Sequence, residues 1–386
     1  ERRGGEVLEP ALEWIREQRA KSFFAFIHFY DPHTPYDPPE PFANRYGTDR
    51  NGRYDGEVAY VDSLVGQLLA VLEEENLYED TRIVLLGDHG ESLGEHGEDT
   101  HGFFIYDATL RVPLIFKAPG LHRSSRVPAQ VRTIDVMPTI LDLLGIDTPP
   151  NASGSSLLPL LRDPDYEMDL PAYVESHYAR LHFGWAPLRG VRNNHYKYVE
   201  APRSELYDLR TDPEEKMNLF HDKPETVQQL QTAIEEMESR ETSKAREPQT
   251  LDAETAQRLQ ALGYVTASPS NPSSAEDWMD LPDPKERIDL FNRVQEATTL
   301  HLNGQDDLAK SLLVSVLEEA PDVELAYTIL GNLHLQGQKY EEAASVFRGA
   351  LERVGESFNA VYGLALAYKG LGLSLIHISE PTRLQV

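Results

Sequence analysis

Two kinds of hydrophobic pattern alternate along the first 150 residues. Three segments place apolar side chains at the three- and four-residue spacing of amphipathic helices, namely residues 8–20, 54–75 and 133–146. Three short apolar runs have the length of buried strands, namely residues 22–30 (SFFAFIHFY), 81–87 and 112–116. Because buried strands alternate here with amphipathic helices, the pattern predicts an α/β fold built on a largely parallel sheet.

The pattern changes near residue 172. Between 172 and 209, short apolar runs separated by tight turns predict a small antiparallel sheet. Residues 225–263 show helical spacing, and residues 266–284 are rich in Ser, Pro and Asp, which is typical of a linker. We therefore expect one domain over residues 1–265, followed by this linker.

Residues 285–372 are predicted to be almost entirely helical, with a 34-residue repeat. Ala309 matches Ala343 at this offset, and Leu313 matches Phe347. This spacing resembles the tetratricopeptide repeat, whose helix pairs bury a core only by stacking on their neighbours. A plain helical bundle is the alternative. The repeats are expected over residues 290–323 (degenerate), 324–357 (complete) and from 358 (incomplete).

Neither end of the chain fits these patterns. The first ten residues, ERRGGEVLEP, contain no initiator Met and no apolar core of a signal peptide, so we expect the chain to be a fragment. Residues 373–386 (LSLIHISEPTRLQV) lack the small and large positions that the repeat requires. We interpret them as an artefactual tail and leave them out of the predicted fold.

Composition excludes several classes of function. The 64 acidic residues against 36 basic ones give a net charge of −28, which argues against binding to nucleic acid or to an anionic membrane surface. The absence of cysteine excludes disulfides, zinc–thiolate sites and thiol nucleophiles within this chain. No apolar run reaches the ~18 residues of a membrane span.

The segment GDHGESLGEHGEDTHG (87–102) is the clearest candidate for chemistry. Asp88 and His89 directly follow a predicted strand, at the end where open α/β sheets bind ligands. A carboxylate and an imidazole can turn toward one cation as oxygen and nitrogen ligands. The alternative is a polar surface loop. Two ligands do not close a metal site, so further ligands must come from elsewhere.

Other polar residues of these loops are assigned by their setting. His33 lies in a Pro-rich loop, whose rigidity suits a catalytic or anion-binding imidazole. His101, thirteen residues after Asp88, could face the same pocket, although this signal is weak alone. His28 lies inside a predicted strand and is expected to be a core or supporting histidine. A solvated acidic face is expected to contain Glu91, Glu95, Glu98 and Asp99.

Six sequence blocks carry a family resemblance. In chain order they are FIHFYDPHTPY, GEVAYVDSLVGQLL, IVLLGDHGESLGEHGEDTHG, LRVPLIF, VRTIDVMPTILDLLGI and ELYDLRTDPEEKMNL. This order resembles the C-terminal part of the catalytic domain of sulfatases, in the alkaline phosphatase superfamily. The resemblance implies an alkaline-phosphatase-like mixed sheet flanked by helices, with a small antiparallel C-terminal subdomain. An all-α repeat domain would follow it.

The resemblance also implies roles for four residues. Asp88 and His89 match the family's metal pair, which usually holds Ca²⁺, with Mg²⁺, Mn²⁺ or Zn²⁺ in relatives. His33 matches the histidine that contacts the sulfate or the leaving-group oxygen, so His33 and His101 are the catalytic candidates. His101 stands where many members carry a sulfate-binding Lys, and an imidazole there is cationic only below its pKa.

The chain departs from the family pattern at the nucleophile. In the family, a Cys or Ser in a Cys/Ser-x-Pro-x-Arg motif becomes formylglycine, and an Asp-Asp pair supplies the first metal ligands. Neither motif occurs in residues 1–265. The Ser-x-Pro-x-Arg match at 379–383 lies in the tail interpreted as artefactual, and the Asp-Asp pair at 306–307 lies in the predicted repeats. We expect both upstream of Glu1, so that this chain alone binds metal poorly and hydrolyses no ester.

The intact protein is accordingly expected to be a sulfuric ester hydrolase. Its substrate would be a sulfated small molecule or glycan, and its repeats would bind a protein or peptide partner. A phosphodiesterase or phosphonate monoester hydrolase of the same superfamily is one alternative, and a non-catalytic scaffold is another. The sequence leaves the compartment open, and a periplasmic or extracellular site is compatible with the resemblance.

Overall fold

The computed structural model describes residues 2–121, 124–242, 278–355 and 357–373. Contacts divide the chain into two compact units. The first consists of Glu1–Glu95 and Leu110–Leu170, and the second consists of His96–Thr109 and Pro171–Val386. The chain therefore passes from the first unit into the second at residue 96 and returns to the first at residue 110.

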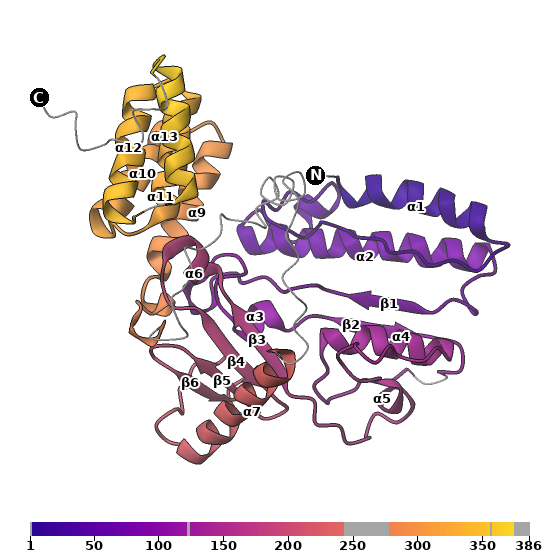
Figure 1. Cartoon of the computed structure of the whole chain (residues 1–386). Coiled ribbons are helices and arrows are strands. Elements are labelled where there is room, and N and C mark those ends of the chain that lie inside the picture. The colour runs from indigo at the N-terminus through magenta and orange to yellow at the C-terminus, as the bar shows by residue number, and fades with distance from the viewer. Residues whose placement is uncertain (1, 122–123, 243–277, 356, 374–386) are drawn as a thin grey trace, which may run out of the picture. The chain divides into compact units, whose positions relative to one another are not determined.

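Two helices of the first unit lie side by side (Figure 1). They are α1 (Gly4–Gln18) and α2 (Arg50–Glu74), and both confirm helices that the apolar spacing predicted. Asp49 caps α2, because its side chain accepts a hydrogen bond from the backbone N–H of Gly52. A short 3₁₀ turn, η1 (Phe42–Asn44), precedes this cap.

The strands of the first unit are antiparallel. β1 (Ile83–Leu86) pairs with β2 (Leu114–Lys117), in a register that sets Ile83 opposite Lys117 and Leu86 opposite Leu114. The prediction of a largely parallel sheet is therefore wrong for the described strands. A short, continuously apolar run indicates burial but carries no information on the direction of its neighbour.

The strand predicted over residues 22–30 is also absent. This segment is extended, but it pairs with no strand in the described part of the chain. Phe24 and Phe26 are 78% and 81% exposed, whereas Phe23 is partly covered by Trp14. His28 is exposed, so its expected core position is wrong. Apolar residues make a segment suitable for burial, but only a neighbouring strand can bury it.

The last part of the first unit contains a buried carboxylate, that of Asp135. The turn η3 (Thr133–Asp135) leads into α4 (Val136–Leu144), which ends at Gly145 with the left-handed φ of 67°. The Asp135 side chain is completely buried and pairs with Arg132 at 2.8 Å. The helix α5 (Leu158–Arg162) contributes to a separate apolar cluster around Leu157, Leu160 and Leu170.

The second unit contains a four-stranded antiparallel sheet in the order β3-β4-β5-β6. Its strands are β3 (Ala172–Ser176), β4 (Leu188–Arg192), β5 (Tyr196–Glu200) and β6 (Glu205–Asp208). They lie where the sequence predicted short strands. Each pair of neighbours is consecutive in the chain, because the connections are too short for a crossover. Only the connection from β3 to β4 holds a helix, α6 (Tyr178–Phe183).

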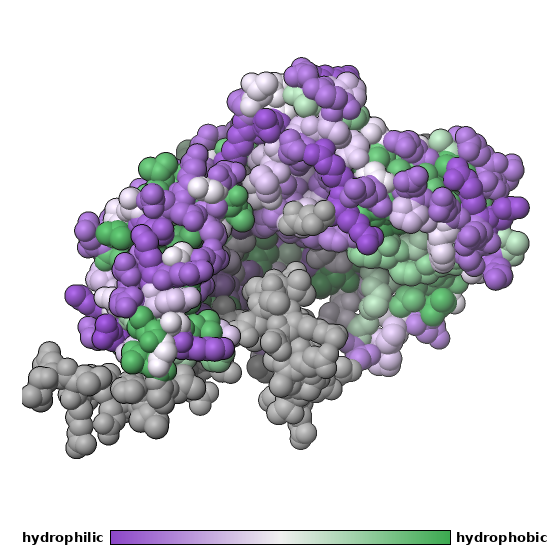
Figure 2. Space-filling model, turned by 90° about the horizontal axis from the view of Figure 1, so that it is seen from above, coloured by the Kyte–Doolittle hydropathy of each residue, from purple (hydrophilic) through white to green (hydrophobic). Residues whose placement is uncertain are grey.

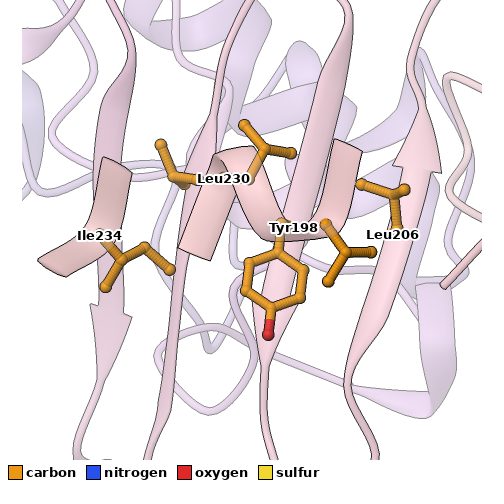
Figure 3. Packing of buried hydrophobic residues seen from close by; sticks show 6 residues of the cluster. Tyr198, Leu206, Leu230 and Ile234 are labelled. Carbon is orange, nitrogen blue, oxygen red and sulfur yellow. The ribbon is translucent and has the colours of Figure 1, made fainter. Parts of the chain in front are cut away.

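A helix covers one face of this sheet (Figure 1). It is α7 (Pro224–Thr242), and its residues Leu230 and Ile234 pack on Tyr198 and Leu206 of the strands (Figure 3). These four side chains are at most 6% exposed. The aromatic and branched side chains of the strands therefore form one core with the apolar stripe of the helix.

Five α-helices follow within the described residues 278–355 and 357–373. They are α9 (Ile288–Leu302), α10 (Asp306–Glu319), α11 (Glu324–Gln336), α12 (Tyr340–Arg353) and α13 (Phe358–Gly370). Consecutive helices pack on one another (Figure 1). The Phe347 ring of α12 occupies the space beside Gly331 of α11 and Gly363 of α13. Small residues at these two positions therefore let the helices approach the ring closely.

Several predictions fall outside the described residues. These are the end of the helix predicted over 225–263, most of the linker at 266–284, and nearly all of the tail at 373–386. Within the described part of the linker, the turn η4 (Trp278–Asp280) precedes η5 (Pro284–Glu286).

The described surface is mainly hydrophilic, with scattered apolar patches (Figure 2). In the described ranges, no helix combines the length and the apolar character that crossing a bilayer requires.

Candidate functional site

Asp88 and His89 lie just beyond the end of β1, where the sequence predicted them. The backbone N–H of Gly87 donates to the Pro113 carbonyl at 3.2 Å, which extends the strand pairing to the residue before Asp88. The Asp88 carboxylate accepts a hydrogen bond from the His89 backbone N–H at 3.0 Å. Both side chains are exposed, Asp88 at 76% and His89 at 42%. The pair is therefore accessible on a loop that a strand holds at its base.

The His89 ring is oriented by its own loop. Its Nδ1 lies 3.0 Å from the Gly90 carbonyl oxygen, which can only accept, so the proton of the neutral ring is on Nδ1. Nε2 then carries the lone pair, and it lies 3.8 Å from Asp88 Oδ2. A backbone carbonyl that fixes the second nitrogen in this way is the usual support of a metal-binding histidine.

This donor set fits a divalent cation. Metal bonds to oxygen and nitrogen are about 2.0–2.6 Å long, so atoms 3.8 Å apart can both reach one ion. In the described residues, however, no group of three or more His, Asp or Glu side chains is arranged to hold a metal. Asp88 and His89 therefore form an incomplete set.

His33 lies close to His89 in the same unit. Their ring centroids are 6.5 Å apart. His33 Nδ1 donates to the Thr34 carbonyl at 2.6 Å, and the ring packs on Tyr30 with centroids 4.4 Å apart. Both contacts come from residues within three positions of His33. The Pro-rich loop therefore orients the imidazole by local contacts, as the sequence predicted for a rigid loop.

His101 belongs to the second unit, on a loop that a buried carboxylate closes. The Glu98 side chain accepts hydrogen bonds from the backbone N–H groups of Phe103 at 2.8 Å and Phe104 at 3.2 Å. Glu98 is 1% exposed, so its assignment to a solvated acidic face is wrong, although Glu95 and Asp99 are exposed. The two backbone amides replace the water that an ionised carboxylate would otherwise require.

A cluster of buried charges follows directly after this loop. Asp107 accepts two hydrogen bonds from Arg192, at 2.9 and 2.7 Å, and one from Lys197 at 3.2 Å. Burial alone would raise the pKa of Asp107, but Arg192 and Lys197 outweigh it and lower that pKa. The chain downstream of His101 is therefore tied to strands β4 and β5.

No sequence pattern indicated that Glu98 or Asp107 would support the His101 loop. The acidic run around Glu98 is polar throughout, and only the fold shows that one of its carboxylates turns inward. Asp107 and Lys197 are ninety positions apart and come together only in the folded chain. Tyr30, the third residue before His33, lies within the motif that predicted His33.

Two family models match the chain. The sulfatase model matches residues 5–146, and the model described as N-sulphoglucosamine sulphohydrolase, C-terminal, matches residues 94–242. Together they cover both loops that carry the candidate histidines. Neither model extends to the helices after residue 285.

Two curated relatives are similar to this chain. Mouse (Mus musculus) arylsulfatase K is 30% identical over 187 residues, which are 46% of this chain and 34% of the relative. The Delta 4,5-hexuronate-2-O-sulfatase of Bacteroides thetaiotaomicron is 32% identical over 168 residues, which are 42% and 35%. The chain thus spans about a third of the length of these relatives.

Solved structures show the same fold at lower identity. A Bacteroides fragilis protein assigned to the sulfatases aligns with a TM-score of 0.54 at 21% identity, over 60% of this chain and 58% of that one. A phosphonate monoester hydrolase of Silicibacter pomeroyi aligns with a TM-score of 0.52 at 22% identity, over 63% and 62%. The chain therefore shares the fold of these two structures over about three fifths of its length. Residues 5–242 of this chain match these two models of sulfatase-family domains.

Proposed function

We propose that the protein containing this chain is a metal-dependent sulfuric ester hydrolase, in which Asp88 and His89 hold a divalent cation. The observation that carries the proposal is the orientation of His89 within sulfatase-family domains. Its Nδ1 donates to the Gly90 carbonyl, and its Nε2 faces the Asp88 carboxylate at 3.8 Å. Calcium is the ion expected from the resemblance, with Mg²⁺, Mn²⁺ or Zn²⁺ as substitutes.

The cation would supply charge that stabilises the sulfate oxygens and lowers the pKa of the nucleophile. Asp88 would contribute a negatively charged oxygen, and His89 a neutral nitrogen held by the Gly90 carbonyl. The remaining ligands would come from outside the described residues, because these contain no group of three or more His, Asp or Glu side chains arranged to hold a metal. The nucleophile, expected as formylglycine, would also come from elsewhere, since residues 1–265 contain no Cys/Ser-x-Pro-x-Arg motif.

His33 is proposed to donate a proton to the leaving oxygen. Its Nδ1 proton is already held by the Thr34 carbonyl, so the second proton of the cationic ring would be on Nε2. Nε2 is then the donor, and the Tyr30 ring packs on the imidazole with centroids 4.4 Å apart. Donation from one positioned acid typically contributes 10²–10⁴-fold to the rate.

His101 is proposed to bind the sulfate group as a cation. The backbone of the loop from Glu98 to Phe104, which contains His101, is held by the hydrogen bonds from the Phe103 and Phe104 N–H groups to the Glu98 carboxylate. A fixed backbone lowers the entropy lost when the imidazole contacts an anion.

The substrate class is proposed to be sulfated glycans or aryl sulfates. The names of the two similar relatives, an arylsulfatase and a hexuronate 2-O-sulfatase, support this class. Hydrolysis of phosphodiesters or phosphonate monoesters is the second candidate. The likeness to the Silicibacter pomeroyi enzyme supports the shared fold but does not decide between the esters. A non-catalytic scaffold is the third candidate.

The helices α9–α13 are proposed to be tetratricopeptide-like repeats, in line with the domain boundaries at 1–265, 266–284 and 285–372. The 34-residue offset places Phe347 of α12 where α10 has Leu313, and both side chains are buried at 1% exposure or less. Such repeats would offer a surface for a protein or peptide partner.

The test uses the protein that joins this chain to the sequence encoded upstream of it. Release of sulfate from an aryl sulfate is measured with added Ca²⁺. We expect Asp88→Asn and His33→Gln each to lower kcat/KM at least 100-fold. The matched controls Asp80→Asn and His28→Gln, both exposed in the first unit, should stay within twofold. Full activity of Asp88→Asn would refute the metal assignment.

A further inference from the structure

The first helix of the C-terminal region packs directly on the His101 loop. The Phe291 ring of α9 stacks on Phe103, with centroids 4.3 Å apart and ring planes 18° apart. Phe103 is completely buried and Phe291 is 1% exposed. Phe103 also contacts Phe183 and Trp185, but edge-on and at 6.1 Å. The ring that stacks on Phe103 therefore comes from α9.

A second contact from α9 reaches the start of the same loop. Asn292 donates a hydrogen bond from Nδ2 to the Gly97 carbonyl at 2.6 Å. Gly97 adopts a positive φ of 84°, and its open side faces the Ile288 side chain. Adjacent residues of one helical turn, Phe291 and Asn292, thus hold both ends of the loop that contains His101.

The segment before α9 is fixed to the same unit. The backbone N–H of Ala186 donates to the Pro282 carbonyl at 3.0 Å, and the Arg203 N–H donates to Asp283 Oδ2 at 2.8 Å. The Asp283 side chain also accepts from Lys285 at 2.9 Å, and it is 4% exposed as a residue. The helix α9 therefore enters its position over the loop from an anchored turn.

We propose that α9 positions the His101 loop, with Phe291 as the positioning residue, so that the helical region is coupled to the candidate sulfate-binding histidine. Three further hydrogen bonds hold the loop. Two run from the Phe103 and Phe104 N–H groups to the Glu98 carboxylate, and one runs from Ser176 Oγ to the Gly102 carbonyl at 2.7 Å. His101 lies between these anchors. The significance of its position for catalysis rests on the function proposed above.

The coupling has a direct thermodynamic consequence. The same helix packs on α10 and on the His101 loop, so a change that loosens α9 must also weaken the contacts of Phe103 and Gly97. The helical region is then part of the support of the candidate site.

The experiment uses the full 386-residue chain and needs no turnover. Hydrogen exchange of the Phe103 and Phe104 amides reports on loop closure, because both are bonded to Glu98. The rate of His101 modification by diethyl pyrocarbonate, followed by peptide mass spectrometry, reports on the accessibility of the imidazole. The variants are Phe291→Ala and Phe291→Leu. The control is Phe347→Ala, which removes an equally buried ring from α12.

We expect Phe291→Ala to speed exchange at both amides at least tenfold and to raise His101 modification at least threefold. Phe291→Leu, which keeps apolar bulk, should restore most of the protection. Phe347→Ala should leave both readouts within twofold. Unchanged exchange in Phe291→Ala, or an equal rise in Phe347→Ala, would overturn the proposal.

A milder variant keeps the test decisive if both Phe291 variants fail to fold. Asn292→Ala removes only the bond to the Gly97 carbonyl and should shift the two readouts in the same direction by a smaller factor. Values equal to those of the unmodified chain would then refute the coupling. Absence of sulfatase activity from the longer protein would refute the proposed function. It would not affect these two readouts or the positioning of the loop by α9.

Discussion

The Lys197 ammonium lies 2.7 Å from Glu215 Oε1, and neither side chain is more than 1% exposed. Lys197 also donates to Asp107, whose backbone N–H is in turn bonded to Glu215 at 2.7 Å. Burial raises the pKa of Glu215, and the Lys197 charge opposes that shift. Lys197 of β5 and Glu215 therefore both hold Asp107, which follows the His101 loop.

Replacing one partner of this pair should strongly destabilise the fold. Lys197→Met leaves Asp107 and Glu215 facing each other without the ammonium between them, which should cost about 3–5 kcal/mol of unfolding free energy. The measurement is chemical denaturation at pH 7. The control is Lys216→Met, since Lys216 pairs with Glu214 at the surface and both are about 70% exposed. That change should stay within about 0.5 kcal/mol, and equal losses would contradict the account.

Glu57 should make stability fall as pH rises. Burial, with the nearby charges of Asp31 and Asp37, raises the pKa of Glu57 to about 7. The folded chain therefore binds more protons than the unfolded chain between the ordinary carboxyl pKa and about pH 7. Unfolding free energy from this group should decrease across that window, by about 1–3 kcal/mol, and then level off.

The variant Glu57→Gln separates this effect from other titrations. Its amide oxygen can still accept the Asp37 N–H bond, which is 2.6 Å long in the parent chain. We expect Glu57→Gln to match the parent at pH 4 and to exceed its stability at pH 8. The readout is the midpoint of urea unfolding at several pH values. A constant difference between the two proteins at all pH values would show that Glu57 does not titrate as argued.

The Glu98 carboxylate should determine closure of the His101 loop. Glu98→Ala removes the acceptor of two buried amides, which should cost about 2–4 kcal/mol. Glu98→Gln keeps one carbonyl acceptor and should lose less. Asp99→Asn, at the neighbouring exposed residue, should stay within about 0.5 kcal/mol. Thermal unfolding of the three variants tests this order, and an Asp99 effect as large as that of Glu98 would count against it.

Two glycines of the helical region should respond differently to the same change. A Cβ at Gly331 would overlap the Phe347 ring, whereas a Cβ at Gly349 would reach Tyr327 Cε1 at 3.4 Å, an ordinary contact. Gly331→Ala should therefore destabilise by about 1–3 kcal/mol. Gly349→Ala should be neutral or stabilising by up to about 1 kcal/mol, because alanine favours the helix. Denaturation by urea distinguishes the two, and similar values would contradict the packing.

Local patterns predicted most of the helices and the short strands. The helix predicted over residues 133–146 ends at Gly145, where the left-handed φ favours a residue without a side chain. The alternation in residues 172–209 and the 34-residue period likewise depend on nearby positions. The direction of a strand and the choice of its partner, in contrast, depend on residues far apart in the chain. β1 and β2 are antiparallel, and residues 22–30 have no strand partner among the described residues, although all three runs are equally apolar.

The candidate site divides in the same way. Asp88, His89 and His33 were found from motifs, and local contacts orient each of the two imidazoles. The supports of His101 come from far along the chain. Glu98 looks like any residue of an acidic run, and Phe291 looks like any apolar residue of a helix. Only the fold turns one inward and stacks the other on Phe103.

The most direct test of the account is the choice of ester by the longer protein. Rates are measured with an aryl sulfate and with an aryl phosphonate monoester of the same leaving group, in Ca²⁺ and after chelation. The account predicts a higher kcat/KM for the sulfate, loss of that activity on chelation, and loss at least 100-fold in Asp88→Asn. Preference for the phosphonate, or sulfate hydrolysis that survives both chelation and Asp88→Asn, would contradict it.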